Sequence, residues 1–198
     1  MAREYTYMPF GKGKDRIDLV LERKVRKGGY AGVVVSKQFQ ETIGIIVNED
    51  ALDEMNVQSV YITANKDGSA PCIVLSMETF VGIKRGYIPD RFSLLHEVGH
   101  YACGHLMYPP DLKEENAMRV RLLEDNQVSK DELDADAFAA NYLGAEVVAW
   151  ALQESMEQRL ATDLMCGVEE EDISKKALLE YQLRIDAIND RCDFKNHI

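Results

Sequence analysis

Residues 93–105 read Ser93-Leu94-Leu95-His96-Glu97-Val98-Gly99-His100-Tyr101-Ala102-Cys103-Gly104-His105, and they hold three of the four histidines in the chain. The apolar residues of this stretch recur at helical spacing, and Gly104 is a typical helix stop. On such a helix, His96 and His100 lie one turn apart on the same face, and Glu97 lies beside them. The stretch therefore predicts a partly buried helix that carries the pattern H-E-x-x-H.

This pattern predicts a catalytic zinc site. Zinc takes neutral imidazole nitrogens at about 2.0–2.1 Å and keeps one coordination position open for water in catalytic sites. It lowers the pKa of that water from about 15.7 to about 7, and Glu97 would take the proton as the water attacks a peptide carbonyl. The alternative is a helix with two solvated histidines, but the apolar face would bury His96 and His100, where unpaired imidazoles are costly.

A third protein ligand is expected, and two segments offer one. His105 follows His96 by nine residues, whereas zincins of the form H-E-x-x-H-x-x-G-x-x-H place their third histidine ten residues after the first. We therefore interpret His105 as a polar residue just past the helix stop. The other segment is Asp131-Glu132-Leu133-Asp134-Ala135-Asp136-Ala137-Phe138-Ala139-Ala140.

Within this second segment, Glu132 and Asp136 lie four residues apart and therefore share one helix face. Glu132 could bind zinc while Asp136 accepts the second ring N–H of a zinc-bound histidine. Alternatively, Glu132 completes a capping box with Ser129, and Asp136 is an exposed helix residue. Asp134 points roughly 200° away from Glu132 around the helix axis and is the weaker candidate for a ligand.

Two blocks of the sequence resemble the ImmA/IrrE metallopeptidases of bacteria, their phages and mobile elements. The first resembles the family's R-F-T-L-A-H-E-L-G-H with its trailing G-H, and the second its E-x-E-A-D-x-F-A-A. The blocks are Arg91-Phe92-Ser93-Leu94-Leu95-His96-Glu97-Val98-Gly99-His100 with Gly104-His105, and Glu132-Leu133-Asp134-Ala135-Asp136-Ala137-Phe138-Ala139-Ala140.

The resemblance assigns a role to each candidate residue. It implies that His96, His100 and Glu132 bind Zn²⁺, that Glu97 is the general base and that Asp136 is a supporting acid. It also implies a zincin-like fold with a short sheet ahead of the zinc helix, along whose edge a substrate adds as a strand. A repressor or antitoxin is the implied protein substrate, and the implied form is a stand-alone peptidase.

Composition limits the partners of the chain. Its 23 Lys and Arg stand against 34 Asp and Glu, and the formal net charge is −11. This charge would repel phosphate backbones and anionic membranes, so we expect neither direct nucleic-acid binding nor membrane binding. The chain has no apolar run of about 18 residues and no secretory signal pattern at its start, so we expect a cytoplasmic protein.

The remaining patterns predict an α+β fold, with a small antiparallel sheet packed beside a mainly helical zincin-like part. One domain is expected over residues 1–198, with a strand-rich part at about 30–80, zinc helices at about 90–143 and C-terminal helices at about 145–192. A short helix is predicted over residues 17–25. The predicted strands are Gly32–Lys37, Ile43–Asn48, Val60–Ala64 and Cys72–Met77, the last two joined as a hairpin by an Asp-Gly turn.

The function expected from these features is that of a zinc endopeptidase acting on a cytoplasmic regulatory protein. The alternative is a binding or regulatory module that contains zinc without peptidase activity. An acid between the two histidines favours catalysis, because a structural zinc site would be closed by a fourth ligand and would not need Glu97.

Overall fold

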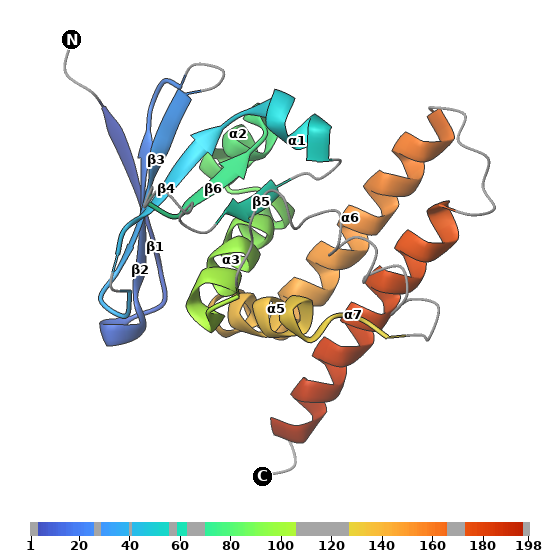
Figure 1. Ribbon diagram of the computed structural model, residues 1–198. Helices are drawn as coiled ribbons and strands as arrows, with labels where there is room; N and C mark the ends of the chain where they lie inside the picture. Colours follow the sequence, from blue (N-terminus) through green and yellow to red (C-terminus); the bar gives the residue numbers. More distant parts are fainter. Residues whose placement is uncertain are drawn as a thin grey trace.

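The computed structural model describes residues 4–25, 29–39, 41–55, 59–62, 70–105, 127–165 and 173–195. A twisted sheet forms one side of the protein, and the helices of the second half of the chain pack beside it (Figure 1). The arrangement is α+β, as the sequence predicts.

The sheet has six strands in the order β1-β2-β3-β4-β6-β5, so that β5 lies at one edge. Their bounds are β1 (Tyr5–Phe10), β2 (Ile17–Glu22), β3 (Gly29–Ser36), β4 (Ile43–Val47), β5 (Ser59–Ile62) and β6 (Cys72–Leu75). Four neighbouring pairs are antiparallel, but β4 and β6 are parallel. The expectation of a purely antiparallel sheet is therefore wrong. A parallel pair needs a crossover connection, and here the crossover contains the short helix α1 (Glu49–Met55) and β5.

The helix predicted over residues 17–25 is also wrong, because residues 17–22 form β2. Ile17, Leu19 and Leu21 are fully buried, and the residues between them are partly exposed. That alternation has the period of a strand rather than of a helix. The strand-rich part accordingly begins at Tyr5, well before its expected start at about residue 30.

The four predicted strands correspond to β3, β4, β5 and β6, and β5 does pair antiparallel with β6. The predicted Asp-Gly turn, and the end of the strand expected at residues 63–64, lie outside the described residues. Two short helices were not expected from the sequence, α1 and α2 (Met77–Arg85).

In the residues that the structure describes, the longer helices after the sheet are α3 (Ile88–Cys103), α5 (Lys130–Leu143), α6 (Ala145–Met165) and α7 (Ile173–Lys195). Pro89 lies in the first turn of α3, where its missing N–H costs nothing and its fixed φ suits a helix. Gly104 ends α3 with φ of 77°, a left-handed conformation that glycine adopts without the strain of a Cβ. Local sequence thus sets both ends of the helix that carries H-E-x-x-H.

Helix α3 is held in the core by one apolar face. Phe92, Leu94, Leu95 and Val98 are at most 4% exposed, and they belong to the same core cluster as the inward side chains of the sheet. Gly99 allows a close approach to α5, because a Cβ built there would lie 2.9 Å from Cα of Ala135. Because α3 and α5 approach so closely, side chains from the facing surfaces of the two helices can contact one another.

None of the helices in the described segments is both long enough and apolar enough to cross a membrane.

Candidate metal centre

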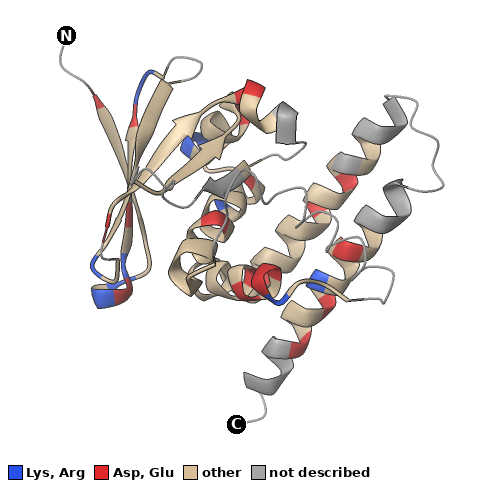
Figure 2. Ribbon diagram, in the orientation of Figure 1, with Lys and Arg blue, Asp and Glu red and all other residues tan. Residues whose placement is uncertain are grey.

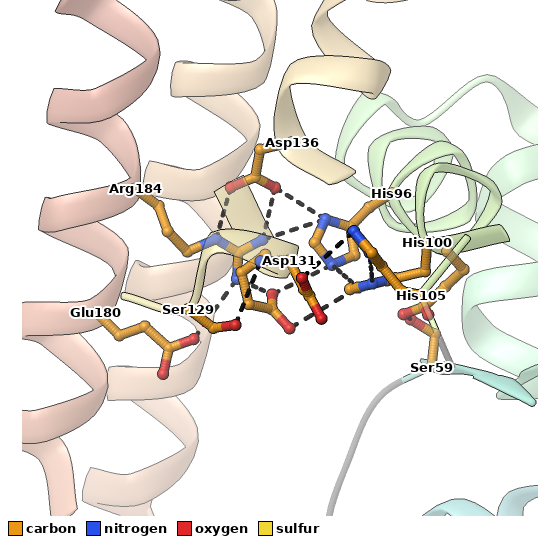
Figure 3. Close-up of polar contacts among 11 residues, drawn as sticks. Ser59, His96, His100, His105, Ser129, Asp131, Asp136, Glu180 and Arg184 are labelled. Atoms are coloured by element: carbon orange, nitrogen blue, oxygen red, sulfur yellow. Dashed lines mark hydrogen bonds and ion pairs between the residues drawn. The ribbon is translucent and has the colours of Figure 1, made fainter. Parts of the chain in front are cut away.

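His96, His100 and Glu132 converge at the place where α3 meets α5. Figure 3 labels the two histidines, whose rings lie close together. Nε2 of His96 lies 3.1 Å from Nε2 of His100 and 3.3 Å from Oε2 of Glu132, and Nε2 of His100 lies 3.8 Å from Oε1 of Glu132. One donor atom from each residue lies within 4.8 Å of the other two. All three residues are buried.

These separations fit one small cation. Four ligands at about 2.0–2.1 Å in a tetrahedron lie about 3.3 Å from one another, close to the 3.1 Å and 3.3 Å measured between the nitrogens and to the nearer glutamate oxygen. Two neutral imidazoles and one carboxylate are also the donor set of many catalytic zinc sites. The residues therefore suit a zinc ion with one coordination position left for water.

The orientation of His96 is set by Asp136. Nδ1 of His96 lies 2.8 Å from Oδ1 of Asp136, which is fully buried on α5 one turn after Glu132. A carboxylate in this position can accept the Nδ1–H, so that Nε2 is the nitrogen that could bind a metal. The structure thus places Asp136 where the sequence analysis expects it, and the alternative of an exposed helix residue is wrong.

Arg184 on α7 holds Asp136 in turn, and sequence analysis did not identify it. Nε and Nη2 of Arg184 donate to Oδ2 and Oδ1 of Asp136, each at 2.7 Å. Nη1 lies 3.4 Å from Oε2 of Glu132 and 3.7 Å from Oε1 of Glu180. Figure 2 shows acidic positions on α5 and a basic position on the neighbouring helix α7. The sequence signal was one of two arginines within the amphipathic stretch Ile173–Cys192, and its partner lies 48 residues away.

The orientation of His100 is set by His105. Gly104 and His105 donate their backbone N–H groups to the carbonyls of Tyr101 and His100, at 3.1 Å and 3.0 Å. This Schellman motif turns the chain back on the helix end, so that Nδ1 of His105 lies 2.9 Å from Nδ1 of His100.

His105 is outside the group of metal donors in the described residues. Its other nitrogen, Nε2, lies 3.4 Å from Oδ1 of Asp131 on α5. The glycine stop was predicted, but the contact with His100 was missed; the signal was a histidine directly after a C-terminal glycine, since the Schellman turn folds that position onto the last helical turn.

Glu97 lies beside the donors and is 6% exposed. Oγ of Ser59, at the start of β5, donates to its Oε1 at 2.8 Å. Sequence analysis missed Ser59, because the serine lies in a short strand 38 residues before its partner.

The competing interpretations of the second segment are also decided by the geometry. Ser129 caps α5 by accepting from the backbone N–H of Asp131 at 3.3 Å, while the carboxylate of Glu132 lies against the histidines. Asp134 is partly exposed, pairs with Lys130 at 3.6 Å and is not among the metal donors.

The surrounding charges and burial shift the pKa values of His96 and His100 in opposite directions. Burial opposes a charge on His96, but the carboxylates of Glu132 and Asp136 outweigh it and raise the pKa of His96 to about 10. Burial, together with the charge of His96, lowers the pKa of His100 to about 3. Burial also opposes ionisation of Asp136, yet Arg184 prevails and lowers the pKa of that carboxyl below its usual value. These opposite shifts make His96 the more basic of the two imidazoles.

Comparison with protein-family models, with curated proteins and with solved structures gives no match for this chain. The functional argument therefore rests on the geometry of the site.

Proposed function

We propose that the chain is a zinc-dependent endopeptidase of the ImmA/IrrE type. The observation that carries the proposal is the convergence of His96, His100 and Glu132, whose donor atoms lie within 4.8 Å of one another, with Glu97 buried beside them. A site used only for structure would need no acid at that position.

Each residue has a defined part in this reaction. A bound zinc ion would supply an activated water near neutral pH and polarise the substrate carbonyl. Glu97 would be the general base, taking the proton from the attacking water and delivering it to the leaving amine. Ser59 fixes one oxygen of that carboxylate through its 2.8 Å hydrogen bond.

The edge strand of the sheet favours the proposal that the substrate is a peptide. In the described part of the chain β5 is the last strand of the sheet, and Ser59 at its start touches Glu97. An extended peptide added alongside β5 would pair through backbone hydrogen bonds and pass the general base. Such a substrate needs a flexible segment, because only an extended chain can pair in this way.

The charge of the protein suggests the nature of the substrate. A net charge of −11 attracts a basic partner, such as a DNA-binding repressor or an antitoxin, and salt would weaken that attraction. We expect the substrate to be a regulatory protein of this kind.

The test is Glu97→Gln, which replaces the carboxylate by an amide without removing a metal donor. General bases contribute about 10²- to 10⁴-fold, so cleavage of a fluorescence-quenched peptide library should fall by that factor while zinc content stays at about one ion per chain. Glu146→Gln, on the exposed surface of α6, is the matched control and should cleave like the wild type.

The outcomes separate the parts of the proposal. Near wild-type cleavage by Glu97→Gln would refute its role as the base. A wild-type protein that takes up no zinc, or a His100→Ala variant that keeps it, would refute the metal site. Zinc binding without cleavage of the library, or of a partner captured by Glu97→Gln, would instead favour a binding module.

A further inference from the structure

Arg184 is a buried cation that the proposed reaction does not itself use. Its side chain is 9% exposed, and it enters the site from α7, opposite the helix that carries the histidines (Figure 3). A buried guanidinium is stable only when its N–H groups are paired. Here the fork of Arg184 is matched to Asp136 by two bonds of 2.7 Å.

We propose that Arg184 is a positioning residue of the metal centre, acting through Asp136 to keep Nε2 of His96 directed at the metal. This inference rests on the metal binding in the proposed function. It extends the site from the two helices of the sequence motifs to α7.

Arg184 fixes the carboxylate plane of Asp136. Oδ2 accepts from Nε of Arg184, and Oδ1 accepts from Nη2 while lying 2.8 Å from Nδ1 of His96. Asp136 is fully buried, so its oxygens are shielded from bulk water. A lysine could supply the charge but not the two-pronged geometry.

The proton on His96 also depends on Asp136. A neutral imidazole carries one N–H, and the nitrogen beside an ionised carboxylate is the one that holds it. Nη2 of Arg184 also lies 3.4 Å from Nδ1 of His96, but its contact with Oδ1 of Asp136 is much shorter, at 2.7 Å. The shorter contact makes Oδ1 of Asp136 the acceptor for Arg184, and Oδ1 also lies 2.8 Å from Nδ1 of His96, where it can accept the ring N–H.

Loss of the guanidinium would affect both Asp136 and His96. Without the two N–H groups of Arg184, Oδ1 and Oδ2 of Asp136 lose the contacts that fix the carboxylate plane. The carboxylate could then rotate about its Cβ–Cγ bond, and Oδ1 would no longer be held 2.8 Å from Nδ1 of His96. The imidazole would lose the acceptor that orients it, so Nε2 would no longer be held in the direction of the metal.

The experiment uses the full chain and the variants Arg184→Gln and Arg184→Lys, with zinc affinity measured by competition against a chromophoric chelator. Changes behind a metal-bound histidine cost about 10- to 100-fold in affinity, and we expect both variants to fall in this range. Lys130→Gln removes a positive charge from the exposed side of α5 and should stay within about twofold of the wild type. Circular dichroism identifies folded samples, and Arg184→Lys keeps the buried charge if Arg184→Gln does not fold.

The tautomer of His96 gives a readout that a purely structural role would not move. With imidazoles labelled with nitrogen-15, the zinc-loaded wild type should show a low-field Nδ1–H signal that Asp136→Asn and both Arg184 variants weaken or lose. Because Arg184 acts through Asp136, the losses should not add. The double variant Arg184→Gln/Asp136→Asn should lose no more zinc affinity than the single variant with the larger loss.

The inference is overturned if the wild type binds zinc and the Arg184 variants bind it equally well. It is also overturned if they lose only thermal stability while the His96 signal persists, or if the losses of the two single variants multiply in the double variant. A wild type that binds no zinc refutes the proposed metal site and this inference with it. The two failures are thus distinguishable.

Discussion

Gly99→Ala tests whether the spacing of α3 and α5 sets the metal centre. The added Cβ would lie 2.9 Å from both Cα and the carbonyl oxygen of Ala135, and 3.1 Å from Cβ of Phe138. Ordinary contacts of this kind begin at 3.4 Å, so the helices must separate by roughly 0.5 Å at this point. Metal sites tolerate deviations of only about 0.2 Å in ligand distance.

The size of the effect follows from the packing. Overfilling a packed site costs about 1–3 kcal/mol, and the higher helix propensity of alanine returns about 0.5–1 kcal/mol. We therefore expect a net loss of about 1–2 kcal/mol in the free energy of unfolding. Because His96 and His100 lie on one helix and Glu132 on the other, a similar strain on the ligands corresponds to a loss of about 5- to 30-fold in zinc affinity.

The assay combines thermal unfolding of the metal-free protein with zinc competition. Gly13→Ala is the control, since Gly13 has φ of 64° and its added Cβ would meet nothing within 4 Å. It should lose about 1 kcal/mol of stability through backbone strain and keep its zinc affinity. If Gly99→Ala binds zinc as tightly as Gly13→Ala does, the helix spacing does not set the site.

Two further predictions concern the half-buried Asp90 and the contact between His100 and His105. Burial and the nearby Glu78 raise the pKa of Asp90 to about 6. A pKa that is higher in the folded than in the unfolded protein stabilises the fold fully below the unfolded value of about 4, and this stabilisation is lost as the pH rises through about 6. Asp90→Asn should therefore melt at a higher temperature than the wild type at pH 8. The difference in melting temperature should vanish below about pH 4. An equal difference at both pH values would contradict this. His105→Ala removes the ring nitrogen that lies 2.9 Å from Nδ1 of His100 and should lower zinc affinity at least about tenfold in the same competition assay. Unchanged affinity would show that the contact does not orient His100.

The sequence alone predicted the parts of the site that depend on helical periodicity. His96 and His100 share a face because they are one turn apart, with Glu97 beside them, and Glu132 and Asp136 share a face for the same reason. The α+β class and four strands were also predicted, since turn residues and apolar runs are local features. The error at residues 17–22 was local as well, because Ile17, Val20 and Leu21 also match helical spacing and only pairing with the neighbouring strands favours the strand.

The tertiary structure alone decided which residues surround those two helices. Arg184 reaches Asp136 from 48 residues away, and Ser59 reaches Glu97 from 38 residues away. No spacing rule connects such positions, because the contact depends on how α7 and β5 pack against α3 and α5. The sequence therefore determined the candidate metal donors, and packing determined the residues that orient them. Hydrogen bonds between residues far apart in the chain form only when the helices and strands have come together in the core.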